Sequence, residues 1–215
     1  MERATTVTAA GKIMGLNIIG PDQLDGFKDQ MGIILPFKRK SEIPPIPFST
    51  GLLEQYCDTH LLILGITWAA DGEALTLVKM RSHFGVDPGQ REPCFYNQDW
   101  YLNEAFAKSF ALAPNWFLMR KDLAGHSRGK EPSELPGNLR LPTALLACFA
   151  FFGYYFVSSG KKLWERDFIW CSDSDHNGDQ IYVGRYNDLS GTNKSGFNIH
   201  RHLKIRENYG IADLV

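Results

Sequence analysis

The chain has 215 residues, a length typical of one domain or two small ones and sufficient to bury a substantial hydrophobic core. Its 23 lysine and arginine residues nearly balance 24 aspartate and glutamate residues, so no net electrostatic field indicates a nucleic-acid partner, and none is expected. A hydrophobic share of 44% and a charged share of 22%, with 20 glycines and 11 prolines, exclude a collagen-like or low-complexity chain.

The first residues predict little ordered structure. Residues 1–13 are small and polar, and we expect a loosely ordered arm followed by a single domain over 14–215. The N-terminus lacks the apolar core of a signal peptide. The four cysteines lie far apart without a C-x-x-C pair, which is typical of free thiols in a reducing compartment. These features predict a cytoplasmic protein.

The segment from 49 to 140 mixes helical and strand-like patterns. A serine or threonine at 49–50 can cap a short helix that ends near His60. The runs 60–68 and 74–80 are β-rich and are separated by an Asp-Gly turn signal, which predicts a β-hairpin. Further along we expect a helix over 103–110, a strand over 115–121 and a polar loop over 124–140.

An uncharged run covers residues 143–157. As a helix it would span only ~22 Å against a hydrocarbon core of ~30 Å, so it predicts a buried helix over 142–157 and no membrane contact. Strand-like runs follow at 167–173, 180–186 and 196–205, and their short connections require antiparallel pairing. The sequence therefore predicts an α+β fold in which a mostly antiparallel sheet packs against a buried hydrophobic helix.

The strongest local motif is an Asp-rich turn. Oxygen-bearing side chains stand at alternate positions around Gly178, at Asp173, Asp175, Asn177 and Asp179. The turn resembles the calcium loops of EF-hands and dockerins and the Asp-rich turns of some β-proteins, and this resemblance implies a divalent cation, Ca²⁺, as cofactor. An EF-hand is not expected, because Gly184 stands where the bidentate glutamate belongs and the flanking runs resemble strands.

The same turn has a second interpretation, which we favour. Asn177-Gly178 is the preferred composition of a two-residue type I′ hairpin. In that hairpin His176 would pair with Asp179, which places Asp179 on the opposite face from Asp173 and Asp175 and prevents chelation of one ion. The hairpin would give one apolar face made of Phe168, Trp170, Ile181 and Val183.

Residues 196–205 alternate in polarity. The predicted inward face holds Phe197, Ile199, Leu203 and Ile205, and the outward face holds Asn198, His200, His202 and Lys204. Two imidazoles at i and i+2 on a strand have a spacing that zinc and iron sites use, so His200 and His202 are alternative metal ligands. Two solvent-facing histidines remain the simpler interpretation. Arg201 falls on the apolar side and should extend its head group to solvent or pair with a buried acid such as Asp167.

An aromatic segment at 94–104 mixes rings with amides and acids. It could stack on a sugar or a base, but core aromatics beside a helix cap are favoured. The runs 178–186 and 196–203, GDQIYVGRY and GFNIHRHL, resemble the C-terminal part of a family of uncharacterised bacterial proteins, and this resemblance implies no activity.

No nucleophile–base pair and no complete metal site can be assembled from the sequence. The predicted function is therefore a non-catalytic binding or interaction protein whose partner is a protein or a small molecule. The alternative is a metal-dependent, hydrolytic enzyme. In that enzyme His200 and His202 would bind the metal, and an Asp of the 173–179 turn would act as third ligand or base.

Overall fold

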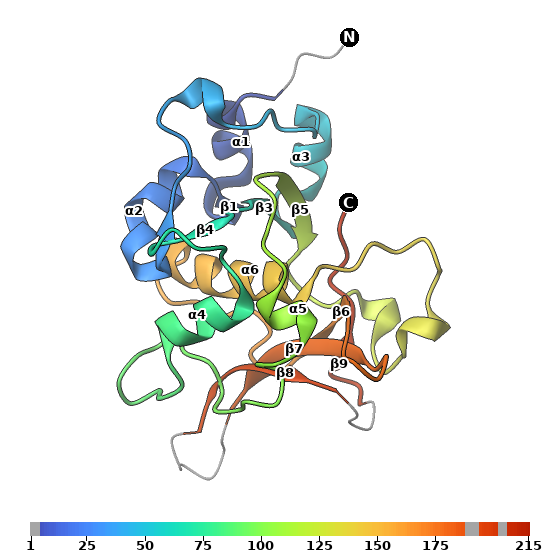
Figure 1. The fold of residues 1–215 in the computed structure, drawn as a ribbon. Coiled ribbons are helices and arrows are strands. Elements are labelled where there is room, and N and C mark those ends of the chain that lie inside the picture. The colour runs from blue at the N-terminus through green and yellow to red at the C-terminus, as the bar shows by residue number, and fades with distance from the viewer. Residues whose placement is uncertain (1–4, 188–193, 202–205) are drawn as a thin grey trace.

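Helix α6 (Ala144–Val157) forms the centre of the fold and lies between two β-sheets (Figure 1). The computed structural model describes residues 5–187, 194–201 and 206–215. Thr143 caps α6, because its Oγ1 accepts a hydrogen bond from the backbone N of Leu146 at 3.1 Å. Residues 144–153 are all buried. The predicted buried hydrophobic helix and the α+β fold class are confirmed.

The first sheet contains β1 (Ile18–Ile19), β3 (His60–Leu64) and β5 (Trp116–Arg120) in the order β1-β3-β5. Strand β3 is antiparallel to β5 and parallel to β1. All five residues of β3 are buried, as expected for a central strand covered on both faces. The predicted strand at 115–121 is confirmed by β5.

The second sheet contains the C-terminal strands in the order β8-β7-β6-β9, with β6, β7 and β8 antiparallel and β9 parallel to β6. Both faces of this sheet are buried. One face packs on α6, and the other packs on apolar residues of the 124–141 segment. The strands are β6 (Phe168–Ser174), β7 (Gln180–Tyr186), β8 (Gly196–His200) and β9 (Tyr209–Gly210).

The register of this sheet differs from the expected one. Trp170 lies opposite Tyr182, so Phe168 and Trp170 face away from Ile181 and Val183 rather than sharing a face with them. The prediction of a single apolar face was wrong. The loop between β6 and β7 is one residue longer than expected, and a shift of one residue turns every side chain of a strand to the other face.

The expected N-terminal arm is largely helical. Residues 1–4 lie outside the described residues, but α1 (Val7–Met14) packs on α3 (Thr50–Tyr56) and buries Ala10 and Met14. The hydroxyl of Thr5 also donates to the backbone O of Phe48 at 2.6 Å. Small residues pack closely here, so their size indicated helix packing rather than disorder. The predicted helix cap at 49–50 is confirmed, because Ser49 accepts from the backbone N of Leu52.

The predicted hairpin over 60–80 forms only next to its turn, where Trp68 and Ala74 make an antiparallel bridge, and the prediction of two long paired strands was wrong. Strand β4 (Trp68–Ala69) pairs with β2 (Ile33–Ile34), and residues of the second run form helix α4 (Leu77–Phe84). Thr76 caps this helix by accepting from the backbone N of Lys79 at 3.2 Å. The buried side chains of α4 recur at helical spacing, so tertiary packing overrides the β-propensity of the run.

The remaining helical elements are short, except for α2. These elements are η1 (Gly15–Asn17), α2 (Pro21–Met31), η2 (Lys40–Glu42), α5 (Ala105–Lys108), η3 (Gly125–Ser127) and η4 (Pro132–Glu134).

In the described part of the chain, no helix combines the length and apolarity that crossing a bilayer would require.

Candidate functional site

The Asp-rich turn is a three-residue hairpin loop. The backbone N of Gly178 donates to the O of Asp175 at 3.0 Å, and the N of Asp175 donates to the O of Asp179 at 3.0 Å. Gly178 has a φ of 88°, whereas Asn177 is not among the residues with positive φ. A type I′ turn needs positive φ at both central residues, so the predicted two-residue loop was wrong. The loop is a type I turn followed by glycine, the common three-residue alternative.

Asp175 stabilises this loop from within. Its Oδ1 accepts hydrogen bonds from the backbone N of Asn177 and of Asp179, both at 2.9 Å, and its Oδ2 forms an ion pair with Arg201. The Asp175 side chain is 0% exposed. Burial by itself raises the pKa of Asp175, but the hydrogen bonds from Asp179, Arg201 and Asn177 outweigh burial and lower it to about 2. The carboxylate is therefore held ionised inside the protein.

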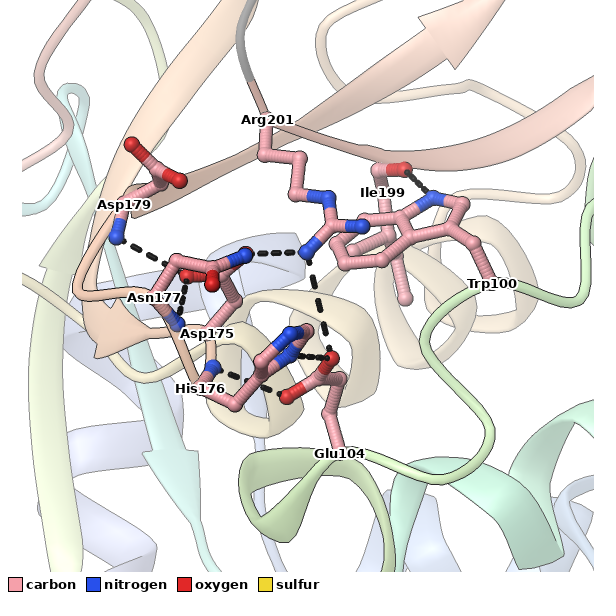
Figure 2. Close-up of polar contacts among 8 residues, drawn as sticks. All are labelled: Trp100, Glu104, Asp175, His176, Asn177, Asp179, Ile199 and Arg201. Carbon is pink, nitrogen blue, oxygen red and sulfur yellow. Dashed lines mark hydrogen bonds and ion pairs between the residues drawn. The ribbon is translucent and has the colours of Figure 1, made fainter.

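Glu104, directly before α5, reaches the tip of the same hairpin (Figure 2). Its Oε2 accepts from the backbone N of His176 at 3.0 Å, and its Oε1 lies 2.6 Å from His176 Nδ1. The Glu104 side chain is 9% exposed, whereas that of His176 is 65% exposed. The imidazole is thus oriented by a buried carboxylate while most of the ring faces solvent.

Arg201 joins the two buried carboxylates. Its guanidinium contacts Asp175 and lies 3.9 Å from Glu104 Oε1. The same group lies over the ring of Trp100, 4.4 Å from the centroid, in cation–π geometry. The prediction that Arg201 pairs with a buried acid is confirmed, but the partner is Asp175. Asp167 pairs with Arg128 instead. We call Trp100, Glu104, Asp175, His176 and Arg201 the hairpin cluster.

The hairpin cluster contains a group that could hold a metal ion. Glu104, Asp175 and His176 each offer a ligand atom, and these atoms lie within 4.8 Å of one another. The sequence does not connect Glu104 to the turn, because this residue lies in the aromatic segment 94–104, 71 residues away from Asp175. Neither His200 nor Asp173 belongs to this group or to any similar group among the described residues.

The proposed calcium ligands are not gathered around one point. Asp173 Oδ2 accepts from the backbone N of Ala144 at 2.5 Å, at the beginning of α6. Asp175 is engaged by turn amides and Arg201, and Asn177 directs its Nδ2 toward Asp175 Oδ2 at 3.5 Å. Asp179 contributes its backbone N to the turn. The structure thus uses the Asp175 carboxylate to stabilise the turn and the Asp173 carboxylate to cap the first turn of α6.

His200, the described member of the predicted histidine pair, is half-buried. The ring of His200 stacks on Tyr182 with centroids 5.7 Å apart, and burial lowers its pKa to about 4. Asn198, expected on the same exposed face, is 1% exposed. The prediction of an exposed face was wrong for these two residues, because apolar residues of the 124–141 segment cover this side of the sheet. His202 lies outside the described residues.

The aromatic segment at 94–104 contributes mainly to the core. Phe95 and Tyr101 are 0% and 1% exposed. Trp100 is partly buried, and its Nε1 donates to the backbone O of Ile199 at 3.2 Å while its face holds Arg201. The predicted core role is confirmed for Phe95 and Tyr101, and Trp100 serves the hairpin cluster.

A cavity of about 330 Å³ opens beside α5, with walls from the 110–113 segment, β5 and the beginning of α6. Thr143 and Asp173 supply polar groups in an otherwise apolar lining. Burial raises the pKa of Asp173. Phe110, at the cavity, is 58% exposed, a large apolar side chain left in solvent. The main apolar lining residues are Phe106, Phe110, Leu112, Phe117, Leu145 and Leu146.

No family model, curated protein or solved structure matches the chain. The resemblance of its C-terminal runs to a bacterial family stays a prediction.

Proposed function

We propose that the protein is a non-catalytic binding protein for a small, mainly apolar molecule. The observation that supports this proposal is the 330 Å³ cavity, whose lining is apolar except for Thr143 and Asp173. Ligand pockets combine mostly apolar walls with a few polar groups and occupy ~300–1,000 Å³. An apolar cavity of ~150 Å³ already binds benzene. A cavity of twice that size suits a substituted ring or a short alkyl chain.

A cytoplasmic location is part of this proposal. The four cysteines are free thiols, and three of them, Cys94, Cys148 and Cys171, are buried. Unpaired cysteines are typical of proteins kept in a reducing compartment.

Toluene tests the cavity, because it is apolar, neutral and small. Methyl NMR spectra of the wild-type protein should shift on toluene addition, with the largest shifts at Leu112, Leu145 and Leu146. Ala111 lies exposed at the cavity, so Ala111→Trp should fill the cavity from outside without disturbing the core and should abolish these shifts. Ala70→Trp, an equally exposed site on the β4 turn, is the matched control and should bind as wild type does. Saturating toluene without methyl shifts would contradict the proposal.

A second candidate function is metal-dependent chemistry at the hairpin cluster. Two carboxylates and an imidazole suit zinc or manganese, and the ligand atoms of Glu104, Asp175 and His176 already lie within 4.8 Å of one another. These residues take the place of His200 and His202 in the sequence-based alternative. Arg201 competes with any cation, because it already neutralises Asp175.

That competition gives a sharp test. In calorimetric titrations with Zn²⁺ or Mn²⁺, Arg201→Gln should bind the ion more tightly than the wild-type protein, and Arg201→Gln/His176→Ala should lose the gain. Arg128→Gln is the matched control, because it removes an arginine from the exposed Asp167 pair instead. If neither the wild-type protein nor Arg201→Gln binds an ion stoichiometrically, the metal function is wrong.

A further inference from the structure

The charge distribution of the cavity is asymmetric. Among the described residues that line it, Asp173 alone carries a charge, and Thr143 is the polar neighbour. Asp173 Oδ2 accepts from the backbone N of Ala144, and burial and backbone hydrogen bonds are the influences on its pKa, with no contribution from a basic side chain. The backbone hydrogen bonds come from Ala144 and from Asp173 itself, so no side chain neutralises this carboxylate among the influences on its pKa. A partly buried carboxylate in apolar surroundings is costly without a cation.

Each class of ligand head group would meet this carboxylate differently. A carboxylate or phosphate head would be repelled by Asp173 and would leave its own charge unpaired. A hydroxyl head could donate one neutral hydrogen bond. An ammonium head would form a charge-assisted hydrogen bond, which is roughly twice as strong, and would place its other N–H groups toward Thr143 and solvent.

We propose that the cavity selects small primary amines with an apolar body, whose ammonium group binds the Asp173 carboxylate while the ring or chain packs against Phe106, Leu145 and Leu146. This inference rests on the proposed binding function and adds the class of ligand. The positive end of α6 does not attract an anionic ligand here, because Asp173 already caps it through Ala144.

Three probes with similar bodies and different heads test the inference: 2-phenylethylamine, 2-phenylethanol and 3-phenylpropionate. At pH 7.5 the wild-type protein should bind the amine about tenfold more tightly than the alcohol, the difference expected when a charge-assisted bond replaces a neutral one. The acid should bind most weakly. Asp173→Asn keeps an oxygen that can accept from Ala144, so the fold should persist while the preference for the amine disappears and alcohol binding remains.

The controls separate this inference from the proposed function. Asp25→Asn makes the same charge change on the exposed surface of α2 and should keep the wild-type order of affinities. If the alcohol or the acid binds as tightly as the amine, or if Asp173→Asn keeps the amine preference, the ligand class is wrong while binding in the cavity stands. If toluene also fails to bind, the binding function itself is wrong.

Discussion

The Glu104 carboxylate binds both the ring and the backbone of His176. One oxygen lies 2.6 Å from Nδ1, and the other accepts from the backbone N at 3.0 Å. Because Glu104 directly precedes α5 and His176 lies at the tip of the β6–β7 hairpin, the pair attaches one element to the other across 72 positions of sequence. A bidentate contact to a buried carboxylate fixes both position and orientation.

The first prediction concerns this attachment. Glu104→Gln should lower the free energy of unfolding by about 1.5–3 kcal/mol, the typical contribution of hydrogen bonds to a charged group. His176→Ala should cost less, because most of its side chain is exposed. A double-mutant cycle measured by urea unfolding should give a coupling energy of about 1 kcal/mol between the two residues.

Glu54→Gln, on the exposed face of α3, is the matched control and should leave stability within ~0.5 kcal/mol of wild type. Additive effects of the two cluster variants would show that the Glu104–His176 contact does not stabilise the hairpin in solution.

The second prediction concerns the turn itself. A Cβ at Gly178 would meet no atom within 4 Å, so any cost of substitution comes from its φ of 88° alone. Gly178→Ala should therefore destabilise the protein by about 1 kcal/mol, and Gly178→Val by more, because β-branched residues resist positive φ. Gly178→Asn should cost least, since asparagine tolerates this region. Equal melting temperatures for the alanine and asparagine variants would contradict this account.

The third prediction concerns calcium. Asp173, Asp175 and Asn177 already hold protein partners and are not gathered around one point. We expect millimolar Ca²⁺ to leave the melting temperature unchanged, because a ligand that does not bind the native state adds no stability. A rise that Asp175→Ala abolishes would restore the calcium interpretation.

Local patterns predicted part of the fold. The sequence predicts α6 because an uncharged run of that length is buried whatever its neighbours. It also predicts the Ser49 cap, because capping depends only on residues that are adjacent in the chain. The helical state of 77–84 was missed, since β-propensity yields to packing. The register of β6 and β7 was missed because Asn-Gly fits two loop lengths, and only the tertiary structure selects one.

The candidate site was harder to predict for a different reason. The Asp-rich motif points to Asp175, and the apolar position of Arg201 predicts a buried acid as its partner. The acid that completes the cluster is Glu104, and no local spacing in the sequence connects it to the turn. The cavity likewise depends on side chains from α5, β5 and α6 that meet only in the folded chain. The exposed Phe110 is a signal that sequence alone could not give, because exposure is a property of the fold.

The fourth prediction concerns stability at mildly acidic pH. Burial lowers the pKa of His200 to about 4, against about 6.5 in an unfolded chain. As the pH falls from 6.5 to 4, the imidazole therefore becomes protonated in the unfolded chain but stays neutral in the folded protein. The stability that neutral His200 contributes is therefore fully present above pH 6.5 and decreases as the pH falls toward 4. His200→Phe keeps a ring against Tyr182 and should reduce the slope of this decrease in urea unfolding measured from pH 7 to 4, while His60, whose pKa burial also lowers to about 4, still contributes. His126→Phe, on the exposed side of η3, should not. An unchanged slope in His200→Phe would mean that the ring is solvated in solution.

The last prediction concerns the stability that ionised Asp175 contributes between pH 4 and pH 2. The pKa of Asp175 is about 2 in the folded protein and about 3.9 in an unfolded chain. Between these two pH values the carboxylate is ionised in the folded protein and protonated in the unfolded chain. The stability that results is therefore present above pH 4 and is lost as the pH falls toward 2. Asp175→Asn should be about 3 kcal/mol less stable than wild type at pH 6, because it removes the ion pair with Arg201 and leaves that guanidinium only the more distant carboxylate of Glu104.

That difference should narrow steadily between pH 4 and pH 2, where wild-type Asp175 also becomes neutral, and urea unfolding at four or five pH values would measure it. Asp58→Asn, on the exposed surface after α3, should show no such difference at any pH. A gap between Asp175→Asn and wild type that stays constant down to pH 2 would contradict this prediction, because it would show that the charge of the carboxylate is not the source of the difference.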